Sequence, residues 1–251
     1  MEEKNYRVLR IEEQLYGCEE LPEGQPVLCD VLLEAADGTQ RVLPYPDAEL
    51  TRLDINEGST VTLRDHRLAK AAHKVYFTRH GETVWNVENK ICGMTDSPLT
   101  EKGRAQAREL GEKLRASGLR IDEILYSPLS RAADTARAIA EATGIPARCE
   151  PRLREQCFGR YEGTPRDGEE FRISKTHFAD RYSGGESMMQ LAQRIYNLLD
   201  KLRADTDKTY LLVAHNGIAR VVQSYFYDMT NEEYAAAGIK NCEFVEFTFN
   251  K

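Results

Sequence analysis

Residues 74–82 read KVYFTRHGE, an apolar run that ends abruptly in polar and charged residues. The apolar part, residues 75–77, is the length of one short buried strand, and the Arg-His-Gly that follows would lie in the turn beyond it. From Leu99 to Leu114, apolar residues recur at helical spacing, and Thr100 stands where an N-cap is needed. A strand, a polar turn and a helix in this order indicate the start of an α/β domain.

The same alternation continues toward the end of the chain. We predict further buried strands over residues 124–126 and 210–214, and helices over residues 130–142, 188–202 and from about residue 217. Strands that alternate with helices favour a mostly parallel sheet covered on both faces. Residues 73–251 are therefore expected to form a three-layer α/β/α domain.

The chain before residue 73 has a different rhythm. Short alternating runs are separated by turn residues such as Asp37-Gly38, and prolines interrupt any helical periodicity. We expect residues 1–72 to form a small all-β domain, a barrel or a sandwich, with His66–His73 as the linker. Residues 1–72 hold 15 Asp and Glu against 8 Lys and Arg, whereas residues 73–251 hold 26 of each. The formal charge of −7 therefore arises entirely in this acidic N-terminal region.

Composition excludes several classes of protein. Hydrophobic residues make up 41% and charged residues 30%, the balance of a soluble globular protein, and no apolar run is long enough for a membrane span. Phosphate backbones repel an acidic domain, so neither nucleic acid nor an anionic membrane is an expected partner. The charged stretch Met1–Arg10 lacks the apolar block of a signal peptide, and we expect a cytoplasmic location.

Six cysteines are scattered without a CxxC pair or a nearby histidine at metal-ligand spacing. In a cytoplasmic chain we expect free thiols, several of them buried, and no structural zinc site. Cys157 could be oxidised, but we expect its thiol to be inert. The six are Cys18, Cys29, Cys92, Cys149, Cys157 and Cys242.

Three polar clusters follow predicted strands: Arg79–Glu82, Ser127–Arg131 and His215–Gly217. Ligands of open α/β sheets bind beyond the carboxyl ends of the strands, so these clusters are expected to meet at one edge. Two arginines and two histidines in one cleft suit phosphoryl transfer, because a guanidinium matches phosphate oxygens and stays cationic. Nearby arginines would also keep a nucleophilic imidazole neutral.

The sequence resembles the histidine phosphatase (phosphoglycerate mutase-like) superfamily. The resemblance rests on ordered blocks that span residues 74–250, whereas the N-terminal region resembles nothing we recognise. The blocks are residues 78–83 with Trp85-Asn86, residues 99–103, residues 127–132 with Thr135-Ala136, residues 153–155 with Phe158-Gly159 and Glu162-Gly163, residues 184–187, and residues 213–217.

The resemblance implies a role for each matching side chain. His80 would attack phosphorus and become phosphorylated, and Glu155 would protonate the leaving oxygen and later activate water. Glu162 and Glu82 lie in neighbouring blocks and are alternative acids. No metal or organic cofactor is implied. Four further side chains would bind the phosphoryl group: Arg79, Asn86, Arg131 and His215.

The expected reaction is hydrolysis of a small phosphorylated metabolite, and two rivals stay open. A phosphoglycerate-type mutase would return the phosphoryl group to a second hydroxyl, which needs a site closed to water. The stretch from Glu155 to His215 is short for such a lid. A non-catalytic binding protein would use the N-terminal domain, which could also serve as a lid, a partner surface or a homodimer contact.

Residues 164–183 are expected to cover the site. Their basic side chains hint at a second anionic group on the substrate, although interleaved acidic residues also fit a solvated surface. The basic residues are Arg166, Arg172, Lys175, His177 and Arg181.

Overall fold

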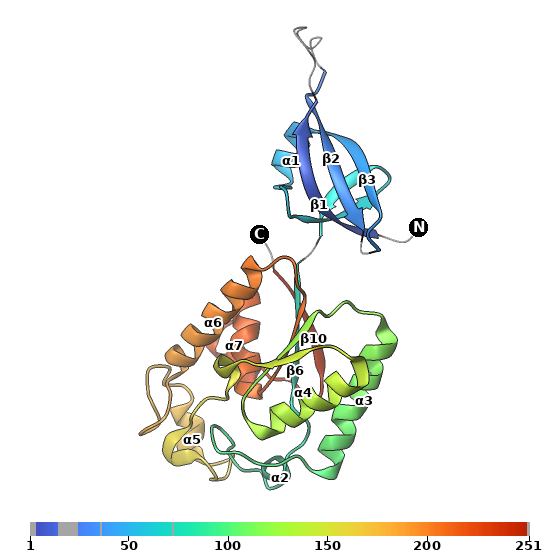
Figure 1. The fold of residues 1–251 in the computed structure, drawn as a ribbon. Coiled ribbons are helices and arrows are strands. Elements are labelled where there is room, and N and C mark those ends of the chain that lie inside the picture. Colours follow the sequence, from blue (N-terminus) through green and yellow to red (C-terminus); the bar gives the residue numbers. More distant parts are fainter. Residues whose placement is uncertain (1–3, 15–24, 36, 72, 250–251) are drawn as a thin grey trace. The chain divides into compact units, whose positions relative to one another are not determined.

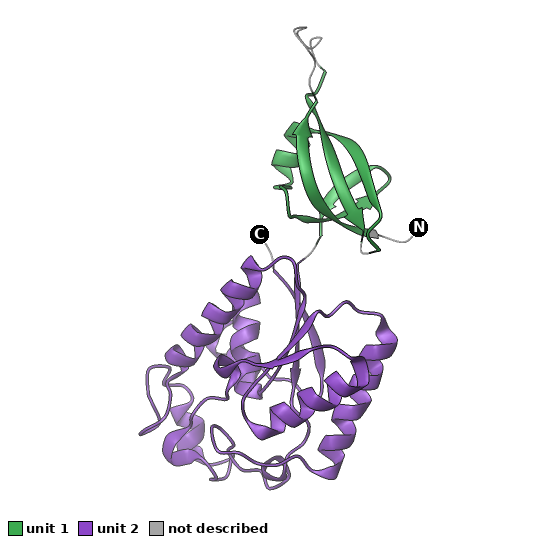
Figure 2. Ribbon diagram, viewed as in Figure 1, with its two compact units in different colours: residues 1–72 green, residues 73–251 purple. Residues whose placement is uncertain are grey.

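The computed structural model describes residues 4–14, 25–35, 37–71 and 73–249. The chain divides into two compact units, residues 1–72 and residues 73–251 (Figure 2). Each unit has its own hydrophobic core, and each is described here by itself.

The N-terminal unit is built on one antiparallel sheet with the strand order β3-β2-β1-β4-β5 (Figure 1). Alternate residues of the strands, such as Val31 and Leu33, point into the core of the unit. The residues between them point away from this core. The strands are β1 (Lys4–Glu13), β2 (Leu28–Ala35), β3 (Gln40–Pro46), β4 (Thr60–Arg64) and β5 (Arg67–Lys70).

The strands of this unit form one sheet, not the two sheets of a sandwich, and β3 and β5 lie at its edges. The Leu68 amide of β5 donates a hydrogen bond of 3.1 Å to the Tyr45 hydroxyl of β3, so the two edge strands approach each other without pairing as a ladder. The unit is also not purely β, because a short helix, α1 (Asp47–Arg52), follows β3. This helix was not predicted because it has six residues and buries only Leu50, so its sequence shows no helical periodicity of apolar residues.

The predicted linker was wrong at its N-terminal end. Residues 67–70 form β5, which pairs with β4 through a two-residue turn at Asp65-His66. Both turn residues have positive φ, as this tight kind of hairpin requires. A four-residue strand that buries only Leu68 gives too weak an alternation to be recognised.

The second unit confirms a mixed α/β fold. Its sheet has the order β10-β6-β9-β7-β8, in which β6, β9, β7 and β8 run parallel and β10 pairs antiparallel with β6. The strands are β6 (Lys74–Arg79), β7 (Glu123–Tyr126), β8 (Ala147–Cys149), β9 (Tyr210–Ala214) and β10 (Phe244–Thr248).

Helices cover both faces of this sheet (Figure 1). Leu212 of β9 packs with the core beneath α6 and α7, whereas its neighbours Leu211 and Val213 pack with the core beneath α3 and α4. The long helices are α3 (Glu101–Ser117), α4 (Ser130–Thr143), α6 (Met188–Ala204) and α7 (Asn216–Phe226), and the short ones are α2 (Val84–Val87), α5 (Glu169–Ser174), α8 (Asn231–Ala236), η1 (Pro151–Leu153) and η2 (Gly159–Tyr161).

The predicted start of α3 is confirmed, because the Thr100 hydroxyl accepts a hydrogen bond of 3.0 Å from the Gly103 amide. Within the described residues, no helix is both long and apolar enough to cross a membrane. Five cysteines in that part of the chain are free thiols, of which only Cys29 is buried; Cys18 lies outside it.

Candidate active site

Strand pairing brings the three polar clusters to one edge of the sheet. β9 lies between β6 and β7, parallel to both, so the carboxyl ends of the three strands coincide. The His80 amide donates to the Ala214 carbonyl at 3.0 Å, and the Ser127 amide donates to the Val213 carbonyl at 3.1 Å. His215, the residue after β9, therefore lies between the loops that carry His80 and Ser127.

The imidazole of His80 is held in one tautomer. Its Nδ1 lies 2.7 Å from the Gly81 carbonyl oxygen, which can only accept a hydrogen bond, so Nδ1 carries the proton and Nε2 carries the lone pair. The side chain is 5% exposed. Burial, followed by the positive charges of Arg131 and Arg79, lowers the pKa of His80 well below its usual value. A neutral imidazole with a free Nε2 lone pair is a competent nucleophile.

His215 packs against His80 with 5.2 Å between the ring centroids. Its Nε2 lies 2.7 Å from Ser127 Oγ, which leaves Nδ1 as the ring atom without a partner among the described residues. The ring is fully buried, and burial together with Arg131 lowers its pKa well below the usual value. Ser127 thus orients the ring that packs against His80.

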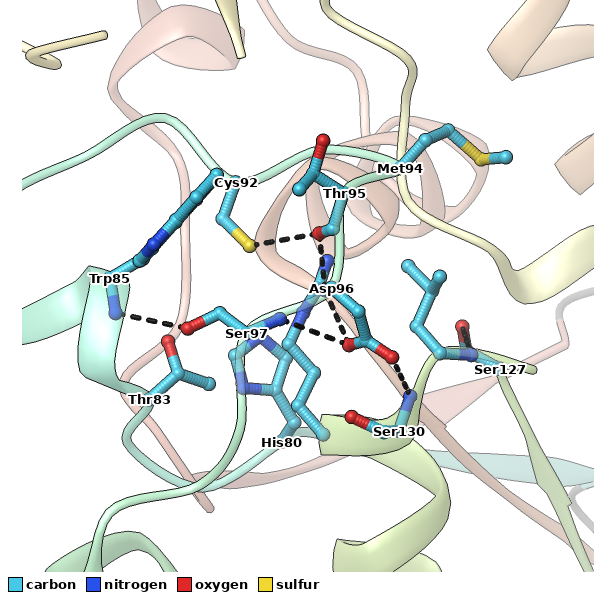
Figure 3. Close-up of polar contacts among 12 residues, drawn as sticks. His80, Thr83, Trp85, Cys92, Met94, Thr95, Asp96, Ser97, Ser127 and Ser130 are labelled. Atoms are coloured by element: carbon cyan, nitrogen blue, oxygen red, sulfur yellow. Dashed lines mark hydrogen bonds and ion pairs between the residues drawn. The ribbon is translucent and has the colours of Figure 1, made fainter. Parts of the chain in front are cut away.

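Arg131 is 1% exposed, and residues 93–96 hold its guanidinium. Its Nη2 donates to the Gly93 carbonyl at 2.7 Å, and its Nη1 donates to the Thr95 carbonyl at 3.1 Å and to Asp96 Oδ1 at 3.3 Å. Asp96 Oδ2 also accepts from the Ser130 amide at the start of α4 (Figure 3). These contacts use one side of the guanidinium and leave Nε unpartnered.

Arg79, at the end of β6, shows the same pattern. Its Nη1 donates to the Ile239 carbonyl at 3.1 Å, while Nε is buried and has no partner within the described chain. Burial, with Arg166 as the next cause, lowers its pKa to about 10, so the guanidinium stays charged at neutral pH.

Three buried nitrogens without partners thus surround His80: Nε of Arg79, Nε of Arg131 and Nδ1 of His215. Buried donors in folded proteins are nearly always hydrogen-bonded, and each unpaired one costs about 1–3 kcal/mol. An anion bound beside His80 Nε2 could accept hydrogen bonds from the two arginine nitrogens, and from His215 Nδ1 when that atom carries the ring proton. The arrangement can therefore bind and transfer an anionic group.

Glu155 is the one of the three candidate acids that lines the same pocket as His80. Its Oε1 accepts from the Gln156 amide at 2.9 Å, and its Oε2 accepts from the Gly217 amide at 3.0 Å. Glu82 instead pairs with Lys102 at 2.8 Å, and Glu162 accepts hydrogen bonds from the loop around Thr95.

Asn86 also lines this pocket. Its Oδ1 accepts from the Thr83 amide at 3.1 Å and from Asn241 Nδ2 at 3.3 Å, so the amide nitrogen is the group it can offer to a ligand. Asn241, which the sequence did not single out, also donates to the His80 carbonyl at 2.8 Å. No motif marks Asn241, because it lies in the loop before β10, far along the chain.

The pocket has a volume of about 120 Å³. Arg166, Phe171 and Lys175 line it, so part of the segment 164–183 does border the site, while Arg172, His177 and Arg181 are exposed outside the pocket lining. Arg220 of α7 is a further lining cation that the sequence did not single out, because no motif marks it. Within the described residues, no group of three His, Cys, Asp or Glu side chains could hold a metal ion.

Comparison with known proteins places this chain in a family. The model of the histidine phosphatase superfamily (branch 1) matches residues 75–251. A protein named "Probable phosphoglycerate mutase GpmB" from Enterobacter sp. (strain 638) is 42% identical over 154 residues, which are 58% of this chain and 70% of that protein.

Two solved structures share the fold. The mycobacterial glucosyl-3-phosphoglycerate phosphatase has a TM-score of 0.61 and 29% identity, covering 70% of this chain and 90% of that one. The α-ribazole phosphatase from Shigella flexneri has a TM-score of 0.61 and 25% identity, covering 71% and 91%.

Proposed function

We propose that this chain, which belongs to the histidine phosphatase superfamily, hydrolyses phosphomonoesters through a phosphohistidine at His80. The observation that carries the proposal is the set of three unpartnered buried nitrogens around a neutral imidazole whose Nε2 is free. A phosphoryl group is the anion that fits both the donors and the nucleophile.

In the first step, the lone pair on His80 Nε2 attacks phosphorus. A P–N bond forms as the ester P–O bond breaks, and Glu155 gives its proton to the departing alcohol oxygen. The imidazole becomes cationic, and the Gly81 carbonyl that accepts from Nδ1 stabilises this charge. Arg79, Arg131 and His215 donate to the equatorial oxygens, where the negative charge is spread.

In the second step, water attacks the phosphohistidine on the side that the alcohol has left. Glu155, now a carboxylate, accepts a proton from this water, the P–N bond breaks, and inorganic phosphate leaves. His80 returns to its neutral form with the proton still on Nδ1. Loss of any one of the oxyanion donors is expected to lower the rate about a hundredfold or more.

A second candidate is transfer of the phosphoryl group to another hydroxyl. The name of the Enterobacter relative, "Probable phosphoglycerate mutase GpmB", favours it. The short chain between Glu155 and His215, which must supply any lid, favours hydrolysis instead. Both reactions share the first step and differ only in whether water or an alcohol accepts the phosphoryl group.

The test is release of inorganic phosphate from p-nitrophenyl phosphate and from a panel of small phosphomonoesters, with EDTA present. Wild-type protein should turn over and His80→Ala should not. Products are analysed for a moved phosphoryl group as well as for free phosphate. A folded wild-type protein that isomerises a substrate without releasing phosphate would establish the mutase reading instead.

A further inference from the structure

The wall of the active-site pocket carries more positive charge than one phosphoryl group needs. Arg166, Lys175 and Arg220 line it in addition to Arg79, and Glu155 is the one carboxylate in the lining. None of these cations forms an ion pair within the part of the chain that the structure describes, whereas Lys102, Arg154 and Arg194 each pair with a glutamate.

The fixed contacts of these side chains leave their charged ends available. Arg166 Nε donates to the Lys90 carbonyl at 2.8 Å, and Arg220 Nε donates to the Ala237 carbonyl at 2.6 Å. Each guanidinium is therefore anchored by its Nε, with the Nη atoms left for a ligand. The Lys175 ammonium lies 4.4 Å from the Phe171 ring centroid, a cation–π contact that holds it at the pocket wall.

Gathering these cations is unfavourable without an anion. Burial, followed by the charges of Arg220 and Arg166, lowers the pKa of Lys175 to about 8. Burial likewise lowers the pKa of Arg166. A bound anion would offset both the desolvation and the mutual repulsion. The phosphoryl group does not fill this need, because Arg79, Asn86, Arg131 and His215 already surround its site.

We infer that Arg166, Lys175 and Arg220 form a second anion subsite, and that the substrate is a phosphomonoester carrying a second anionic group, a carboxylate or another phosphate. The inference rests on the proposed function for the placement of the phosphoryl group beside His80. Ile91, Phe158 and Phe171 line the same pocket and supply apolar surface for a short carbon skeleton.

The exposed cations of the same segment serve as a natural contrast. Arg172 belongs to α5, three residues before Lys175, but it is exposed and absent from the pocket lining. Removing its charge changes the net charge of the segment by the same amount as removing that of Lys175. The pair therefore separates a specific subsite from a general electrostatic attraction.

The test is calorimetric binding of phosphonates, which the enzyme cannot hydrolyse. Propylphosphonate supplies one anionic group; ω-carboxyalkylphosphonates and α,ω-alkylbisphosphonates of graded chain length supply two. The best two-anion ligand should bind wild-type protein at least about tenfold more tightly than propylphosphonate. The carboxylate and phosphonate arms identify which second anion the subsite takes.

Lys175→Met keeps the apolar stem over Phe171, and we expect it to lose about tenfold in the ratio of two-anion to one-anion affinity. Arg220→Gln is a second variant with the same expectation, and Arg172→Met should keep the wild-type ratio. Equal affinities for one-anion and two-anion ligands in wild-type protein would overturn the subsite. Equal losses in Lys175→Met and Arg172→Met would overturn it as well. The proposed hydrolysis and the subsite fail in different measurements. If the hydrolysis proposal is wrong, no phosphate is released, but the preference for two-anion phosphonates is unaffected.

Discussion

The backbone amide of Gly217 donates a hydrogen bond of 3.0 Å to Oε2 of Glu155, and a β-carbon at residue 217 would lie 2.4 Å from Oε1 of the same carboxylate. The absence of a side chain at the start of α7 thus makes room for the proposed acid. This contact ties the loop after η1 to the start of α7, across 62 positions of the chain. It also explains why a glycine follows His215-Asn216.

Gly217→Ala should therefore displace the Glu155 carboxylate while leaving the proposed phosphoryl-binding residues in place. We expect kcat for an alkyl phosphate, whose leaving group needs a proton, to fall at least about tenfold. Steady-state kinetics measures the effect. Gly168→Ala is the matched control, because its β-carbon would meet Pro165 at an ordinary 3.4 Å, and it should keep wild-type kcat. Equal kcat values in the two variants would contradict the role of Glu155 as the proton donor.

Ser127→Ala removes the hydroxyl that lies 2.7 Å from His215 Nε2. The buried ring would lose its partner and its orientation, so kcat should fall about tenfold. KM should change less, since the arginines are untouched. Ser130→Ala deletes an exposed hydroxyl three residues further along and is expected to be neutral. Rescue by Ser127→Thr would show that the hydroxyl, rather than the volume of the side chain, matters.

Glu162→Gln tests how Arg131 is positioned. The Glu162 carboxylate accepts from the amides of Met94 at 2.8 Å, Thr95 at 2.6 Å and Phe158 at 3.1 Å, and the loop it organises supplies the carbonyls that hold Arg131. An amide replaces one acceptor oxygen with a donor, which should cost about 1–3 kcal/mol and lower Tm by roughly 2–12 °C.

Activity of Glu162→Gln should also fall, because the Arg131 guanidinium loses its support. Thermal unfolding and kcat are measured on the same preparation. Glu169→Gln removes an exposed carboxylate from the first turn of α5 and should move neither quantity. Unchanged Tm and kcat in Glu162→Gln would contradict the positioning role.

The affinity for two-anion ligands should depend on pH near 8. The pKa of Lys175 is about 8 without ligand, and the ammonium form is the one that attracts an anion, so binding is full below this pH and weakens above it. The groups that face it from other elements are Arg166, Arg220 and Glu155. The ratio of carboxyalkylphosphonate to propylphosphonate affinity cancels the titration of the phosphonate itself. That ratio should fall from pH 7 to pH 9 in wild-type protein and stay flat in Lys175→Met.

Much of the second unit could be predicted from local signals. Residues 75–77 and 210–214 are apolar runs next to polar turns, and the N-cap at Thr100 is visible in the sequence, because each of these depends on nearby residues alone. The edge strands β8 and β10 have few buried residues and gave no such signal. In the N-terminal unit, β5 and α1 were missed for the same reason.

The site could be predicted only as far as motifs mark it. Six residues carried by ordered blocks were named, and the structure gathers Arg79, His80, Asn86 and Glu155 around one pocket. His215 packs against His80, and the charge of Arg131 acts on His80. Ser127, Arg220 and Asn241 could not be assigned because their importance depends on tertiary contacts. Asn241, for example, reaches the His80 carbonyl across 161 positions of the chain.

The most direct test of the account is whether His80 carries the phosphoryl group. Glu155→Gln should slow the attack of water while p-nitrophenolate still leaves without a proton, so the intermediate accumulates. The protein is mixed with p-nitrophenyl phosphate, quenched in alkali, digested and analysed by mass spectrometry. We predict one phosphoryl group on His80, at Nε2, and none in His80→Ala. Phosphate release by wild-type protein with an unmodified His80 peptide, or persistent release by His80→Ala, would contradict the account.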